Sequence, residues 1–302
     1  MRAPRFARLW IVALALPGLG VAHAGTISGQ FVLGGKTVPV HEVAAFRMRD
    51  QFNPRTVETY VMLTAKPVDR AAISAALDPY TVAINDPAVR DDDYLAFSVR
   101  ADGETGMNAH VGGTQYLDTS GTIMGQPGSL IASCRENTPT RIACSVKTAK
   151  PVKPMDGPAW SIDLSFEADV LARTPGKPLA RDGEAPGKAF LALRDAVGGT
   201  DLAAILALLT PQEAKSYQED WRTAAENLAS AKEMLDIRLP KKPRITGGEL
   251  LATDHAVLEV EGVPYENGRM LYLVEMRLID GRWVYEASSV AGLLRDAAKS
   301  PQ

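Results

Sequence analysis

Residues 270–289, MLYLVEMRLIDGRWVYEASS, decide the fold of the C-terminal half of this chain. Apolar and polar side chains alternate before and after Asp280-Gly281, a pattern that indicates two half-buried antiparallel strands. Asp-Gly between such strands favours a two-residue type I′ turn, which determines the residues that lie opposite one another. The predicted pairs, apolar and on one face, are Leu278 with Trp283, Met276 with Tyr285, and Val274 with Ala287.

A further strand precedes this hairpin, and the turn between them contains Asn267-Gly268. A two-residue loop would mix apolar and charged faces, whereas a three-residue loop with a bulge at Gly268 keeps them apart. We therefore expect Val260 opposite Val274, and Leu258 opposite Met276. The predicted inner face, polar only at two tyrosine hydroxyls, contains Ala256, Leu258, Val260, Tyr272, Val274, Met276, Leu278, Trp283 and Tyr285.

Three amphipathic helices precede this sheet. The third has the clearest start, because Thr210 suits the N-cap, Pro211 the first helical position and Glu213 the reciprocal partner of a capping box. The helices are expected over residues 188–197, 201–209 and 211–238. The predicted inner stripe of the third is Ala214, Tyr217, Trp221, Ala224, Leu228 and Leu235.

Helices followed by a curved antiparallel sheet ending in Asp-Gly-Arg-Trp-Val-Tyr-Glu resemble the nuclear transport factor 2-like superfamily of α+β cones. Phe190-Leu191-Ala192-Leu193 and Gly199-Thr200-Asp201 are further points of likeness. Members of that superfamily include isomerase-like and dehydratase-like enzymes, carriers and association modules. The enzymes need an acid, a base or a histidine inside the cone, and the predicted inner face has no carboxylate. The predicted inner face indicates a filled apolar core whose tyrosine hydroxyls find partners, with a small apolar ligand cavity as the alternative. The candidate cavity residues are Tyr272, Met276, Trp283 and Tyr285.

The N-terminal half is predominantly β, because short alternating segments recur between turn clusters such as Gly34-Gly35 and Gly112-Gly113. This pattern predicts an antiparallel β-sandwich with one short helix at residues 68–77. Thr37-Val38-Pro39-Val40 makes this half look like the β domain of uncharacterised exported bacterial proteins, as does the stretch over residues 62–67. The expected strands are 26–33, 37–47, 57–64, 94–100, 130–134, 141–147 and 160–171.

The first 24 residues have the pattern of a secretory signal peptide. Three arginines precede an apolar stretch over residues 9–21, and Ala22-His23-Ala24 has small residues at both key positions of a cleavage site. We therefore expect a periplasmic or secreted bacterial protein. The expected α+β chain has a signal peptide (1–24), a β-rich domain (25–172), a linker rich in proline and glycine (173–187) and an α+β domain (188–302).

Cys134 and Cys144 are the two cysteines of the sequence. Each lies in an alternating segment, and the turn-forming stretch between them folds the segments into a hairpin that brings the two thiols together. In an exported protein such a pair is expected to form a disulfide. Closing so short a loop stabilises the fold by about 2–3 kcal/mol in the chain-entropy model.

A row of three carboxylates, from Glu259, Glu275 and Glu286, is expected on the outer face of the C-terminal sheet. A solvated convex face explains it, and so does a contact surface for a basic partner or a loosely held divalent cation. His41, His110 and His255 are scattered without metal-ligand spacing, so the sequence predicts no metal site and no cofactor.

The sequence predicts a function by exclusion. The net charge of −3 gives no electrostatic footprint for nucleic acid or anionic lipid. No nucleophile elbow or phosphate-binding loop is present. We expect an exported, non-catalytic module that binds a protein or a small apolar ligand. The alternatives are a small-molecule carrier, an isomerase- or dehydratase-like enzyme using the cone, and an immunity-type inhibitor of a secreted toxin.

Overall fold

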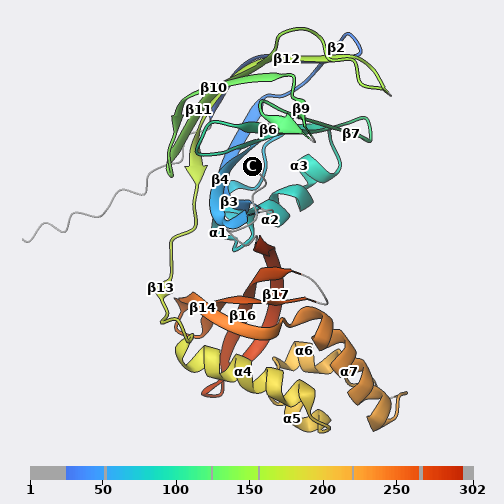
Figure 1. Cartoon of the computed structure of the whole chain (residues 1–302), viewed down its shortest axis with the longest axis vertical. Coiled ribbons are helices and arrows are strands. Elements are labelled where there is room, and N and C mark those ends of the chain that lie inside the picture. Colours follow the sequence, from blue (N-terminus) through green and yellow to red (C-terminus); the bar gives the residue numbers. More distant parts are fainter. Residues whose placement is uncertain are drawn as a thin grey trace, which may run out of the picture.

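The protein is mixed α+β, as seen in a computed structural model that describes residues 25–50, 53–123, 125–155, 157–219, 221–264 and 268–294 (Figure 1). A large curled sheet forms what we call the N-terminal lobe (residues 25–172), and a second antiparallel sheet forms the C-terminal lobe (173–294). The signal peptide expected over residues 1–24 lies outside the described residues. No helix in the described ranges is long and apolar enough to cross a membrane.

The N-terminal lobe is built mainly of strands. In its described part these are β1 (Thr26–Leu33), β2 (Lys36–Val38), β3 (Glu42–Asp50), β4 (Asn53–Thr64), β5 (Tyr94–Val99), β6 (Thr105–Val111), β7 (Thr114–Thr119), β8 (Thr122–Ile123), β9 (Gln126–Pro127), β10 (Leu130–Asn137), β11 (Arg141–Thr148) and β12 (Trp160–Leu171). The helices are α1 (Arg70–Ala75), α2 (Pro79–Asn85) and α3 (Pro87–Arg90).

One continuous sheet replaces the two layers that a sandwich would have. Its strand order is β10-β11-β12-β3-β4-β5-β6-β7, and the join between β12 and β3 is a short parallel pairing at Val170 and Leu171. The sheet curls so that its two halves pack face to face, with the rings of Phe97 and Phe166 stacked at 5.5 Å. The alternation of the sequence predicts this inner face, but it does not reveal the parallel join.

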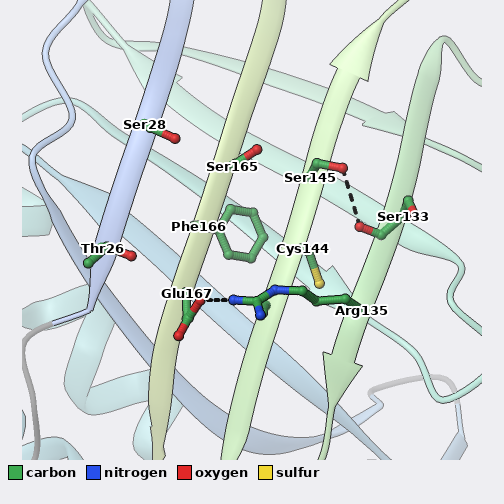
Figure 2. A pocket seen from close by; sticks show the side chains of 10 residues that line it. Thr26, Ser28, Ser133, Arg135, Cys144, Ser145, Ser165, Phe166 and Glu167 are labelled. Atoms are coloured by element: carbon green, nitrogen blue, oxygen red, sulfur yellow. Dashed lines mark hydrogen bonds and ion pairs between the residues drawn. The ribbon is translucent and has the colours of Figure 1, made fainter.

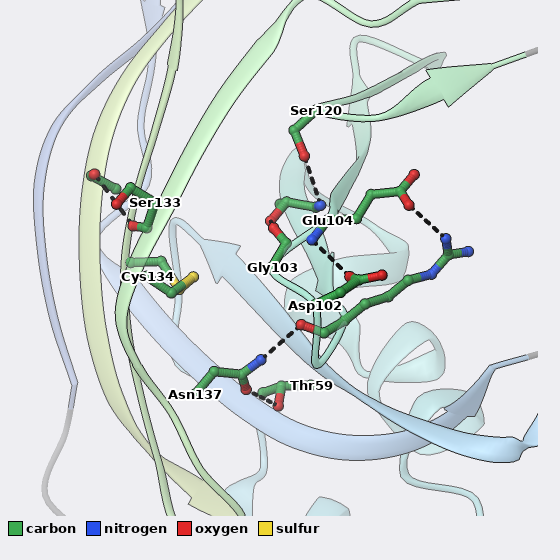
Figure 3. Close-up of a disulfide and its surroundings, with 12 residues drawn as sticks. Thr59, Asp102, Gly103, Glu104, Ser120, Ser133, Cys134 and Asn137 are labelled. Carbon is green, nitrogen blue, oxygen red and sulfur yellow. Dashed lines mark hydrogen bonds and ion pairs between the residues drawn. A yellow bond between two sulfur atoms is a disulfide. The ribbon is translucent and has the colours of Figure 1, made fainter. Parts of the chain in front are cut away.

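The predicted disulfide is present, because Cys134 lies directly opposite Cys144 and their sulfurs are 2.01 Å apart (Figure 3). Near it, the Asn137 side chain accepts a hydrogen bond from Thr59 Oγ1 at 2.8 Å and donates one to the Arg100 carbonyl at 3.1 Å. These contacts connect the end of β10 to β4 and to the segment after β5, so they hold the curled sheet closed.

Helices α1–α3 cover part of the outer face of the curled sheet. The sequence predicts one helix here, yet α2 and α3 follow α1 immediately. Each of them begins with an aspartate N-cap, Asp78 or Asp86, followed by a proline at the first helical position. This is a regular start signal that suits even a very short helix.

The C-terminal lobe places helices against one face of a five-stranded antiparallel sheet. Its described elements are β13 (Lys177–Pro178), α4 (Glu184–Gly198), α5 (Leu202–Leu206), α6 (Pro211–Lys215), α7 (Ala224–Arg238), β14 (Lys241–Ala252), β15 (His255–Val263), β16 (Arg269–Ile279) and β17 (Arg282–Leu294).

The third predicted helix is interrupted, so the single helix over residues 211–238 is wrong. Thr210 caps α6 as expected, but the Glu213 carboxylate accepts from Tyr217 and pairs with Arg238 instead of completing a capping box. A second N-terminus with a full capping box begins α7 at Thr223. The chain leaves the helix between the two, and Trp221, expected inside, is 76% exposed.

The hairpin at Asp280-Gly281 has the two positive φ angles of a type I′ turn. The pairs Leu278–Trp283 and Met276–Tyr285 are confirmed, but Val274 lies opposite Ser288 and not Ala287. The reason is a bulge in β17, where Glu286 is the extra residue between the partners of Met276 and Glu275.

The pairing predicted between β15 and β16 is wrong by two residues. Leu258 lies opposite Val274, and Val260 lies opposite Tyr272, so the two strands pair about a centre one residue earlier in the chain than predicted. A shift of two residues keeps every side chain on its face, so the predicted inner face still packs against the helices. The outer face is turned toward the N-terminal lobe (Figure 1).

Candidate functional site

A cleft of about 920 Å³ lies between the two lobes, on the outer face of the C-terminal sheet. Leu77, between α1 and α2, faces Leu273 of β16 across it, and both also line two smaller adjoining hollows. On the N-terminal side of the cleft, the Asp78 carboxylate accepts hydrogen bonds from the backbone N–H and the hydroxyl of Thr81. These bonds hold the start of α2 in place. The rest of the lining is mixed. Its apolar members are Ala75, Ala76, Val82, Ala172, Leu251 and Ala252, and its polar members are Ser74, Thr81, Arg173, Thr174, His255, Glu275 and Ser289.

A polar cluster lies at one end of this cleft. His255 Nε2 is 3.1 Å from Glu275 Oε2, and Arg277 Nε donates to Glu286 at 2.5 Å. One ligand atom from each of His255, Glu275 and Glu286 lies within 4.8 Å of the others, although the sequence showed no ligand spacing. Imidazole and carboxylate are ligands that zinc accepts. Arg277 already neutralises Glu286, so a cation there would have to displace its guanidinium.

The expected row of three glutamates is therefore split. Glu275 and Glu286 are neighbours, because the bulge in β17 redirects Glu286, whereas Glu259 lies opposite Leu273. The Glu259 carboxylate pairs with Arg49 of β3, so it belongs to the contact between the lobes. The contact surface for a basic partner stays a prediction.

The four predicted cavity residues lie on the inner face of the C-terminal sheet. Tyr272, Met276 and Tyr285 are buried in the apolar core, and Trp283 is partly buried against it. The Tyr285 hydroxyl lies 2.9 Å from Ser288 Oγ, which itself donates to the Arg238 carbonyl. Side chains of α4–α7 occupy the space in front of them. Their role in holding a ligand stays a prediction.

A shallow hollow of about 370 Å³ on the outer face of the curled sheet escaped the sequence analysis (Figure 2). Ser28, Ser165, Ser145 and Ser133 lie side by side on four neighbouring strands along its floor. Glu167 lies at one side and pairs with Arg135 and Arg141. The row therefore presents four serine hydroxyls, each separated from the next by the distance between adjacent strands. The sequence could reveal it only if the order of the strands were known.

No protein-family model matches this chain, and no curated protein matches it. Its function is therefore argued from the geometry of these sites.

Proposed function

We propose that this chain is an exported, non-catalytic binding module that holds a small amphipathic ligand between its two lobes. The observation that carries the proposal is the cleft of about 920 Å³, whose lining is apolar at Leu77 and Leu273 and polar at His255 and Glu275. Concave sites with an apolar lining and a few convergent polar groups, placed where two parts of a protein meet, are the usual places for small ligands.

The charges at the cleft support binding rather than proton transfer. His255 is paired with Glu275, Arg277 with Glu286, and Arg173 with Glu249. Charged groups that partners of opposite charge hold in place are well suited to orient the polar end of a ligand. The apolar part of the ligand would lie against Leu77 and Leu273.

The cysteine pair supports export, because disulfides persist in oxidising compartments. The arrangement of α4–α7 on one face of a curved antiparallel sheet supports the proposed likeness of the C-terminal lobe to nuclear transport factor 2-like cones. In this proposal the inner face of the cone serves as a core, and the ligand lies on the opposite face.

Native mass spectrometry of the protein purified from a bacterial periplasm tests the proposal. The expected mass is that of residues 25–302 less two hydrogens, with the additional mass of a bound small molecule. Leu273→Trp fills the cleft and is expected to abolish the additional mass. Ile279→Trp, on the same strand and face but outside the cleft, is the matched control. A folded protein without bound mass, or bound mass retained in Leu273→Trp, would overturn the proposal.

A further inference from the structure

A separate pocket of about 240 Å³ lies on the outer face of the curled sheet, where α1–α3 leave it uncovered. Its floor is formed by β4, β5 and β6, and Tyr80 of α2 closes one side. Met48 and Tyr80 separate this pocket from the hollows that adjoin the cleft. None of the four residues predicted to line a ligand cavity, Tyr272, Met276, Trp283 and Tyr285, lines it.

Glu58 of β4 is the first unusual group in the pocket. The residue is only 9% exposed, and it has no hydrogen-bond or ion-pair partner among the residues that the structure describes. Burial, with Asp50 as a second cause, raises the pKa of its carboxyl. The nearby cation, Arg100, is engaged by Asp50 at 3.6 Å and by Glu104 at 3.0 Å. Arg100 is therefore already engaged by two other carboxylates when Glu58 ionises.

Tyr60 is the second unusual group, two residues further along the same face of β4. It is 6% exposed, and its hydroxyl is buried without a hydrogen-bond partner in the described part of the chain. The Asn108 side chain lies beside it, outside hydrogen-bonding geometry, and its amide oxygen accepts from Gln115 at 3.1 Å. Buried polar groups are nearly always paired, so an orphan hydroxyl that lines a pocket needs an explanation.

Aromatic and apolar groups complete the pocket. The Tyr80 ring meets the Tyr60 ring edge to face, with centroids 5.3 Å apart. Met48 and Leu117 supply apolar walls, and Leu117 is exposed at the rim. An organic cation suits a carboxylate, a hydroxyl and an aromatic ring together.

We propose that this pocket binds a small organic cation, whose primary ammonium group donates to the Glu58 carboxylate and to the Tyr60 hydroxyl. The alkyl part of the ligand lies against Met48 and Leu117. The ligand satisfies the Glu58 carboxylate and the Tyr60 hydroxyl at once. The site is separate from the cleft between the lobes, and its volume of about 240 Å³ accommodates a small amine.

Calorimetric titration of the mature chain with n-butylammonium tests this, with n-butanol as the neutral probe of similar shape. Saturable binding of the ammonium without binding of the alcohol is expected. Glu58→Gln removes a charge-assisted hydrogen bond and should weaken binding by about tenfold or more. Glu42→Gln, on the neighbouring strand β3 and outside the pocket, should bind like the wild type.

Tyr60→Phe separates a binding role from a structural one. Removing an unpaired buried hydroxyl should leave the melting temperature unchanged or raise it, while the affinity for n-butylammonium falls. Equal binding of alcohol and ammonium, wild-type affinity in Glu58→Gln, or no saturation below about 10 mM would overturn the proposal. Because the readout is the added amine, failure here leaves the cleft and its native ligand unaffected.

Discussion

At the scale of single residues, two buried glutamates respond to pH in opposite directions. Burial and Asp50 raise the pKa of Glu58, so the folded state holds this proton more tightly than the unfolded chain does. Its ionisation therefore destabilises the fold at neutral pH. Glu58→Gln should raise the free energy of unfolding above the raised pKa, and the gain should shrink as pH falls toward the ordinary glutamate value near 4.3. Urea unfolding across pH measures this, with Glu42→Gln as the flat control. If the free energies of unfolding of Glu58→Gln and the wild type differ by the same amount at every pH, the prediction is wrong.

Glu261 is the opposite case. Its side chain is 6% exposed, and Arg55, Arg244 and Arg269 all bind it. Burial opposes its charge, yet hydrogen bonds from Arg244 and Arg55 hold the pKa of this carboxyl below its usual value. A lowered pKa contributes stability that is present above the unfolded-state value and lost as pH falls through the folded-state value.

Glu261→Gln should therefore lower the free energy of unfolding by about 1–3 kcal/mol at neutral pH, because charged hydrogen bonds are lost from a buried site. The loss should fade as pH drops through the lowered pKa. Glu259→Gln on the same strand is the comparison. Its carboxylate is a third exposed and, within the described residues, pairs with Arg49 alone, so the substitution should cost less than about 1 kcal/mol. If both variants lose the same free energy of unfolding, the three arginines around Glu261 stabilise the fold no more than a single surface ion pair does.

At the scale of elements, the break between α6 and α7 decides which side chains belong to the core. Leu235 is fully buried against the sheet, whereas Trp221 stacks on Arg222 in solvent. Leu235→Ala should lower the free energy of unfolding by about 2–5 kcal/mol through the cavity it leaves. Trp221→Ala should change it by less than about 0.5 kcal/mol. Denaturant unfolding of both variants measures the contrast. A large loss at Trp221 would favour the single continuous helix that the sequence predicts.

The sequence predicts which face of a sheet a side chain lies on better than it predicts which residue lies opposite, because side chains along a strand alternate between the faces with a period of two. Alternation correctly assigns Tyr272 and Val274 to the inner face, and a two-residue error in register leaves that assignment unchanged. The same error decides whether Glu259 lies opposite Glu275, as predicted, or opposite Leu273, as observed. The cluster of His255, Glu275 and Glu286 also requires a bulge, which has no clear signal in the sequence.

The Glu58 pocket shows a second limit. Glu58 and Tyr60 lie two apart in one strand, and their spacing indicates a shared face. The other lining residues lie 8 to 59 positions from Glu58 or Tyr60, so they depend on which strands pair. The helices α2 and α3 were predictable, since Asp78-Pro79 and Asp86-Pro87 are both regular start signals. Only their shortness hid them, because a helical period needs more than two turns to be recognised.

At the scale of the whole molecule, ion pairs across the lobes hold the cleft in its shape. Arg49 pairs with Glu259, and Arg55 pairs with Glu261 at 3.2 Å, so residues of β3 and β4 in one lobe are bound to β15 in the other. Both arginines are partly exposed, and dissolved salt therefore screens them. Each lobe has its own apolar core, which these pairs do not touch.

The double variant Arg49→Ala/Arg55→Ala should consequently loosen the lobes without unfolding either. We expect a larger radius of gyration in small-angle scattering and a weaker hold on the native ligand of the cleft, while the far-ultraviolet circular dichroism stays that of the wild type. Sodium chloride at about 1 M, where the screening length is about 3 Å, should expand the wild type in the same direction. Arg90→Ala removes an arginine that pairs with its neighbour Asp91 in the same lobe, so it should not change the radius. If the double variant keeps the wild-type radius at low salt, the lobes are held by other contacts, such as those of β17 with β3 and β4, and not by these charges.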